Sequence, residues 1–129
     1  MTTEELKENF AMLGEDDEKF SYIIELGKQL PPYPNDKRDD AHKIYGCSSN
    51  VWFDVDNSSG KYSFLFDSDA LIVRGLLYII GVIFNGKSLP EIKSIDATKF
   101  FDELGLKSIL SNQRQVGLLS IIKKIQDLN

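Results

Sequence analysis

The chain has 129 residues, of which 42% are hydrophobic and 11% aromatic, and this supplies enough apolar surface for the core of a single domain spanning residues 1–129. The formal net charge of −5 argues against nucleic acid or an anionic membrane surface as a partner, because phosphate neutralisation needs clustered Lys and Arg. One cysteine cannot form an internal disulfide, and the N-terminus lacks the basic and apolar segments of a secretion signal, so we expect a reducing, cytoplasmic setting.

Two helices are expected at the N-terminus. Thr2 and Glu5 have the spacing of a capping box, which predicts a short amphipathic helix that ends before Gly14. The acidic run at 15–17 opens a second helix, which the proline-rich surface loop at 31–40 ends. From this second helix, the residues expected to face the core are Phe20, Ile23, Ile24 and Leu30.

The only cysteine lies in a turn, Gly46-Cys47-Ser48-Ser49, directly ahead of a strand-forming run. Glycine permits backbone angles that other residues resist, and small hydroxyl side chains leave room for a partner, so we expect the thiol at an exposed loop tip. Cysteine is also a small hydrophobic residue that is often buried and inert, so the turn alone leaves a reactive and a structural role open. Without a second cysteine on the chain, any redox or sulfur chemistry at Cys47 must be completed by another molecule.

The region after the cysteine predicts an antiparallel hairpin. Apolar and polar residues alternate at 51–56 and again at 61–67, which is the period of a half-buried strand. Between them, Asn57-Ser58-Ser59-Gly60 has the composition of a hairpin turn. An isolated hairpin is marginal in water, so Lys43-Ile44-Tyr45 is expected to add a short third strand.

The second half of the chain is expected to be helical. The apolar run at 71–84 predicts a buried central helix, with Ser68 and Asp69 as its N-caps and with Gly75 and Gly81 packed closely on the sheet. This run is shorter than the roughly twenty residues that a bilayer span requires, so no membrane span is expected.

Three further helices complete the predicted order. N-cap residues predict short helices from Ser88 to Ile95 and from Asp96 to Leu104, and a final helix that begins at Ser111. The residues expected on the inward face of the final helix are Leu118, Leu119, Ile122, Ile125 and Leu128. Two helices, a small antiparallel sheet of two or three strands and four more helices make an α+β fold.

Several blocks of the sequence resemble one family. The heptapeptide Gly46-Cys47-Ser48-Ser49-Asn50-Val51-Trp52 is similar to the Gly-Cys-x-Ser-x-Val-Trp signature of the SufE family of sulfur-acceptor proteins, which includes CsdE. Residues 22–27, 67–76 and 110–118 resemble the family's second helix, the start of its central helix and its final helix, in the same order. The resemblance implies a SufE/IscU-like fold. The chain departs from the family at Ser48, where glutamine is common, and this leaves the hydrogen bonds of that side chain open.

The resemblance implies a sulfur-transfer role for Cys47. It implies that the chain accepts persulfide sulfur from a cysteine desulfurase of the SufS or CsdA type, stimulates that enzyme and delivers the sulfur to an iron–sulfur cluster scaffold of the SufB type in a SufBCD complex. The pyridoxal phosphate (PLP) would then reside in the desulfurase, and the chain would need no cofactor or metal of its own. Such a protein is an accessory in a transferase reaction rather than a stand-alone enzyme. A homodimer remains open.

A sulfur relay also makes demands on the loop that carries the thiol. The thiolate, not the thiol, attacks the donor's outer sulfur, so Cys47 needs access and local stabilisation of negative charge. The bound sulfur must afterwards be shielded from reductants. We therefore expect a loop that packs against an apolar wall, to which Tyr45, Val51 and Trp52 contribute, and that swings out when a partner docks.

Five residues are candidates for supporting the loop or binding the partner: Gly46, Ser49, Asp69, Arg74 and Arg114. Arg114 falls in the first turn of the final helix, where the helix dipole disfavours cations. A solvated side chain and a role near the thiolate both fit that position, and the resemblance favours the role. Asp69 is expected to be an N-cap that also pairs with Arg114. Arg74 is expected to be exposed or to form a salt bridge, with desulfurase docking as the alternative.

Two other functions remain as alternatives. A binding module could activate a desulfurase allosterically without carrying sulfur, in which case Cys47→Ser would keep full stimulation. A Cys-His hydrolase could pair Cys47 with His42, although a single histidine in a charged loop is usually solvated. A metal site is not expected, because a tetrahedral site needs several Cys or His ligands and the chain has one of each.

Overall fold

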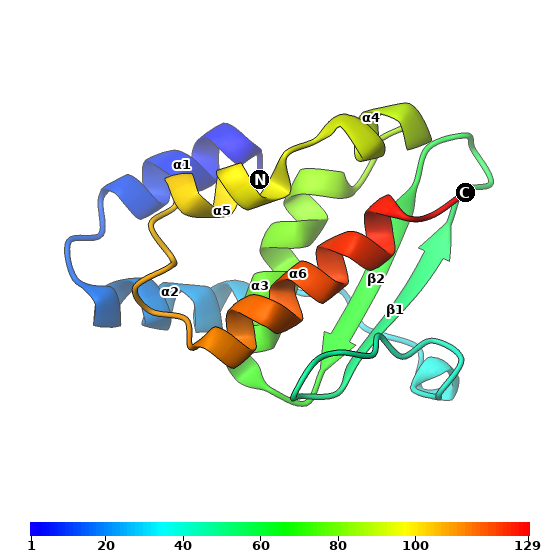
Figure 1. Ribbon diagram of the computed structural model, residues 1–129, viewed down its shortest axis with the longest axis horizontal. Coiled ribbons are helices and arrows are strands. Elements are labelled where there is room, and N and C mark those ends of the chain that lie inside the picture. The colour runs from blue at the N-terminus through cyan, green and yellow to red at the C-terminus, as the bar shows by residue number, and fades with distance from the viewer.

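The computed structural model describes all residues from 1 to 129 and has the predicted α+β architecture (Figure 1). The elements in chain order are α1 (Thr3–Ala11), α2 (Asp16–Gly27), the 3-10 turn η1 (Asn35–Lys37), β1 (Val51–Asp56), β2 (Ser63–Ser68), α3 (Leu71–Phe84), α4 (Leu89–Ser94), α5 (Ala97–Glu103) and α6 (Asn112–Gln126). None of these helices combines the length and the apolar character needed to cross a membrane.

Strands β1 and β2 make up the whole sheet. They pair antiparallel, with Phe53 opposite Phe66 and Val51 opposite Ser68. Side chains alternate along each strand, so these residues face the core while Trp52 and its partner Asp67 lie on the other side. The hairpin therefore buries one face under the helices, as the alternating pattern predicted.

The predicted third strand is wrong. Lys43 pairs with Trp52 through an isolated bridge only, and the Ile44 N–H donates to the Val51 carbonyl at 2.8 Å. The chain then turns at Gly46, whose φ of +95° lies in the left-handed region. This turn directs the cysteine loop away from the sheet edge before a second pair can form.

Helix α3 lies between α2 and the hairpin (Figure 1), and its two glycines, Gly75 and Gly81, pack against different elements. A Cβ built at Gly75 would lie 1.9 Å from the Ile23 carbonyl oxygen of α2, so this glycine permits close contact between two helices. The prediction that Gly75 packs on the sheet is therefore wrong. Gly81 does face the sheet, because a Cβ there would lie 3.9 Å from Phe66. Six residues of helix place the two glycines about 120° apart around the axis, so they cannot share a neighbour.

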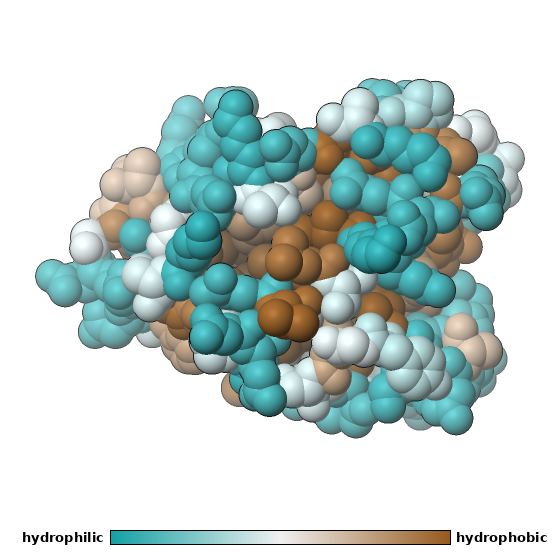
Figure 2. All heavy atoms as spheres, in the orientation of Figure 1, coloured by the Kyte–Doolittle hydropathy of each residue, from teal (hydrophilic) through white to brown (hydrophobic).

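Two side chains predicted to face the core are exposed, Leu119 at 49% and Phe20 at 40%. Leu119 lies about 100° around the helix from Leu118, which takes the buried position. Phe20 lies near the start of α2, over a shallow depression beside Ile109 rather than over α3. Figure 2 shows apolar surface gathered over the middle of α6, with hydrophilic surface around it.

Candidate functional site

The cysteine loop closes against helix α6. The Cys47 thiol donates a weak hydrogen bond to the Gly117 carbonyl oxygen, with 3.6 Å between sulfur and oxygen. Gly46 permits this approach, because a Cβ there would lie 2.8 Å from Ser120 Oγ. A Cβ at Gly117 would lie 3.6 Å from Cys47 Sγ, which is an ordinary contact distance, so the loop tip packs directly on this turn of α6. The thiol is consequently half-buried, and the expectation of an exposed loop tip is wrong for this conformation.

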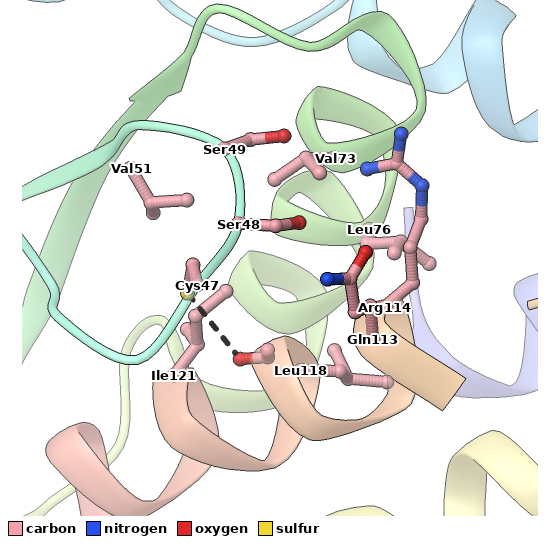
Figure 3. Close-up of a pocket in the computed structure, with 11 residues that line it drawn as sticks. Cys47, Ser48, Ser49, Val51, Val73, Leu76, Gln113, Arg114, Leu118 and Ile121 are labelled. Carbon is pink, nitrogen blue, oxygen red and sulfur yellow. Dashed lines mark hydrogen bonds between the residues drawn. The ribbon is translucent and has the colours of Figure 1, made fainter. Parts of the chain in front are cut away.

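Cys47 faces a small pocket between its loop, α3 and α6 (Figure 3). The pocket has a volume of about 20 Å³, close to that of one water-sized group. Its lining residues are Cys47, Ser48, Ser49, Val51, Val73, Leu76, Gln113, Arg114, Gly117, Leu118 and Ile121. Of the three residues expected to form an apolar wall, Val51 does so, whereas Tyr45 is exposed and Trp52 lies outside the lining.

Burial raises the pKa of the Cys47 thiol above its usual value. The only hydrogen bond of the thiol goes to a carbonyl, and no cationic side chain is bonded to the sulfur. At neutral pH the closed loop therefore holds Cys47 as a neutral thiol. The stabilised thiolate that nucleophilic attack requires is not formed in this conformation.

Asp69 holds the C-terminal base of the cysteine loop through Asn50. Its carboxylate accepts a hydrogen bond from the Asn50 backbone N–H at 3.1 Å and another from the Asn50 side-chain amide at 2.8 Å. The Ser68 hydroxyl donates to the Asn50 carbonyl at 2.6 Å. The predicted N-cap role of Ser68 and Asp69 is wrong, because Ala70 is the N-cap of α3 and has no side-chain cap.

Two of the candidate residues, Arg114 and Ser49, line the cysteine pocket. Arg114 lies in the first turn of α6, where its backbone N–H donates to the N-cap hydroxyl of Ser111 at 3.2 Å. Figure 3 shows its guanidinium extending away from Cys47. The expected ion pair between Arg114 and Asp69 is absent, and the Asp69 carboxylate instead accepts both of its hydrogen bonds from Asn50.

Arg74 lies outside the pocket lining, in a cluster on the other side of α3's first turns. Its Nε lies 3.8 Å from an Asp67 carboxylate oxygen, while Arg38 donates to the same carboxylate at 2.7 Å. The expectation that Arg74 is exposed or forms a salt bridge thus matches the structure. The only histidine, His42, contacts Asp39 with 2.7 Å between Nδ1 and the carboxylate, and no hydrogen bond joins it to Cys47.

Sequence reasoning missed Asn50 and Gly117, the two residues that hold the loop at its base and beneath its tip. Asn50 lies within the signature, but its partners Ser68 and Asp69 are 18 and 19 positions away in the chain. Gly117 is 70 positions from the thiol it touches, and its one signal was a small residue in an amphipathic helix. No group of three or more His, Cys, Asp and Glu side chains is arranged to hold a metal ion.

Fold and site together define a class: a small α+β protein with one half-buried cysteine on a loop that closes over a one-atom pocket. The chain belongs to the SufE family, described as an Fe-S metabolism associated domain, whose sequence pattern matches residues 4–129. The resemblance drawn from the sequence is thereby confirmed.

Named relatives agree with this assignment. An uncharacterized SufE-like protein of Rhizobium etli is 40% identical over 129 residues, covering 96% of this chain and 86% of the relative. The sulfur acceptor protein CsdE of Escherichia coli K12 is 37% identical over 126 residues, covering 97% and 86%. A solution structure of a hypothetical protein from Thermus thermophilus shares the fold at a TM-score of 0.76 and 18% identity, covering 98% of this chain and 93% of that one.

Proposed function

We propose that this protein is a sulfur acceptor that receives persulfide sulfur on Cys47 from a PLP-dependent cysteine desulfurase of the SufS or CsdA type, and that stimulates the desulfurase by doing so. The observation that carries the proposal is the single thiol facing a pocket of one-atom size. Membership of the SufE family and similarity to a protein named a sulfur acceptor support it.

The transfer step needs no oxidant or reductant. The Cys47 thiolate attacks the outer sulfur of the donor's persulfide, and the donor's sulfur–sulfur bond breaks as the new bond forms. The donor cysteine leaves as a thiolate and takes up the proton that Cys47 released. Cys47 then carries the persulfide, and the donor is ready for another cycle.

The pocket suits the storage of this product. A volume of about 20 Å³ leaves room for one added atom beside Cys47 Sγ. Val51, Val73 and Leu76 are buried side chains of its wall, and they exclude water-borne reductants from a sulfur held there. The closed conformation therefore protects the persulfide between loading and delivery.

Loading requires the loop to open, because the closed thiol is covered and neutral. The movable segment runs from Tyr45 to Asn50, since Ile44 is buried and bonded to Val51 at the loop's base. Three extended residues span about 10 Å, so the Cys47 Cα stays within that distance of Ile44. The donor must bring its persulfide to the protein surface at this place.

Intact-protein mass spectrometry tests the proposal. Wild type and Cys47→Ser are incubated with a cysteine desulfurase and L-cysteine and compared under non-reducing conditions. We expect wild type alone to gain the mass of one sulfur atom, reversibly with reductant. Faster desulfurase turnover with no mass gain, and equal stimulation by Cys47→Ser, would instead assign the protein to the class of allosteric modules.

Delivery to a scaffold is the second half of the proposal. Loaded protein, freed of desulfurase and mixed with a SufBCD-type complex, should lose its added sulfur while the scaffold gains it. Retention of the sulfur on Cys47 would exclude that scaffold as the acceptor.

A further inference from the structure

Helix α6 presents apolar side chains to solvent beside the cysteine loop. Val116 is 58% exposed and Leu119 is 49% exposed, and they lie one turn apart on the outward face of the helix. The apolar surface over the middle of α6 in Figure 2 interrupts an otherwise hydrophilic face. Single exposed apolar residues are ordinary. Val116 and Leu119 are instead neighbours on one helix face, and Leu119 also lines a groove.

A groove lies on the far side of Leu119 from the cysteine loop, between α5 and α6. It has a volume of about 220 Å³, below the ~300–1,000 Å³ typical of small-molecule sites and suited to one or two inserted side chains. Its apolar lining residues are Phe101, Leu106, Leu110, Leu118, Leu119 and Ile122. The groove is preformed, because the Gln115 side-chain amide donates to the Leu110 carbonyl at 2.9 Å and so fixes one wall to α6.

The groove and the cysteine pocket share a wall. Leu118 lines both of them, from the same turn of α6. Val116 adjoins Gly117, whose carbonyl accepts the thiol hydrogen bond. Gly117 and Leu119 are two residues apart, about 3 Å along the helix axis. The cysteine loop, Val116, Leu119 and the groove thus form one continuous surface, which we call the α6 surface.

We propose that the α6 surface is the docking site of the protein that donates sulfur to Cys47, with apolar side chains of the donor inserted into the α5–α6 groove. This inference rests on the proposed function. The docked protein is identified by the shortness of the cysteine loop. Because Cys47 cannot move far from the loop's base, the sulfur donor must itself bind the surface around that base. Even a transient interface covers about 600 Å² per partner, a disc of about 14 Å radius, so a donor centred on Cys47 also covers Leu119 and reaches the groove.

A second copy of this chain fits the same surface less well. A stable dimer through the α6 surface would cover the cysteine loop and exclude the donor from it. The donor interface is expected to be transient, with a buried apolar anchor surrounded by polar contacts. Asp102 and Lys107 lie at the groove and supply one charge of each sign for such a rim.

The test compares charged substitutions on and off the α6 surface. Val116→Lys and Leu119→Lys place a cation where the donor's apolar side chains would dock, and Met12→Lys does the same at the end of α1, where Met12 is 79% exposed. Dissociation constants for a cysteine desulfurase are measured by calorimetry with full-length proteins. We expect Val116→Lys and Leu119→Lys to weaken binding about tenfold or more and Met12→Lys to leave it unchanged.

Controls separate this inference from the function on which it rests. Thermal unfolding shows that each variant is folded, as expected for side chains already exposed. Wild type that gains sulfur while all three variants bind equally well would overturn the docking site alone. Wild type that neither binds desulfurase nor gains sulfur would overturn both proposals. A dimer that Leu119→Lys converts to monomer, at unchanged desulfurase affinity, would assign the α6 surface to a second copy.

Discussion

Removing the Asp69 carboxylate should release the cysteine loop. Asp69→Ala deletes both acceptors of the Asn50 amide groups, at 3.1 and 2.8 Å, and leaves the Ser68 hydrogen bond in place. A charged acceptor strengthens such bonds, but Asp69 is exposed, so we assign about 1 kcal/mol to each and about 2 kcal/mol at most to the pair. If the bonds break when the loop opens, the open fraction rises about 5- to 30-fold.

Alkylation of Cys47 reports this opening directly, because a reagent reaches the thiolate only in the open loop. We expect the alkylation rate of Asp69→Ala to exceed that of wild type by the same factor of about 5 to 30. Hydrogen exchange of the amides at 46–50 should accelerate in parallel. Asp56→Ala is the matched control, since its carboxylate also caps a loop N–H, that of Ser58 at 2.9 Å, but at the far end of the hairpin. Alkylation rates of Asp69→Ala within about twofold of wild type would show that the Asp69–Asn50 hydrogen bonds do not hold the loop closed.

The remaining expectations concern stability. Because burial raises the pKa of Cys47, the unfolded chain releases the thiol proton at a lower pH than the folded chain does. The free energy of unfolding should therefore fall as the pH rises through the usual titration range of cysteine. Denaturant titrations at a pH below and a pH above that range should show a smaller loss in Cys47→Ala than in wild type. Gly75→Ala should lower the free energy of unfolding by about 3 kcal/mol or more, because its Cβ would lie 1.9 Å from the Ile23 carbonyl oxygen. Gly14→Ala is the control: a Cβ there has no atom within 4 Å, so the substitution should not destabilise the protein. Asp67→Ala should cost about 2 kcal/mol, because it removes the acceptor of the Arg38 hydrogen bond and the negative charge that faces Arg74 at 3.8 Å. An unchanged denaturation midpoint would show that the cluster contributes nothing.

Most helices and strands could be predicted because their boundary signals are local. Thr2 and Glu5 form the expected capping box, and Ser88, Asp96 and Ser111 each accept the expected N-cap hydrogen bond. The errors arose where tertiary contacts compete with a local pattern. Asp69 has the composition of an N-cap, but the neighbouring loop offers it two donors from Asn50.

The candidate site could be predicted in part. The signature singled out Cys47, and the structure places the candidates Ser49 and Arg114 in the lining of its pocket. Arg74 was grouped with them, yet it faces Asp67. Position along a helix does not say which neighbour a side chain meets when the helix is surrounded on several sides. The roles of these residues in sulfur transfer remain predictions for the experiments above.

The sequence by itself determined the order and type of the elements, the family and the one residue available for thiol chemistry, because capping, periodicity and composition act over a few neighbouring residues. Only the tertiary structure decided the state of that thiol. Whether Cys47 is covered, neutral and beside a one-atom pocket depends on Gly117, 70 positions away, and on how α6 packs across α3. Burial and its effect on the thiol pKa come from contacts between distant segments, and these exist only after the chain has folded.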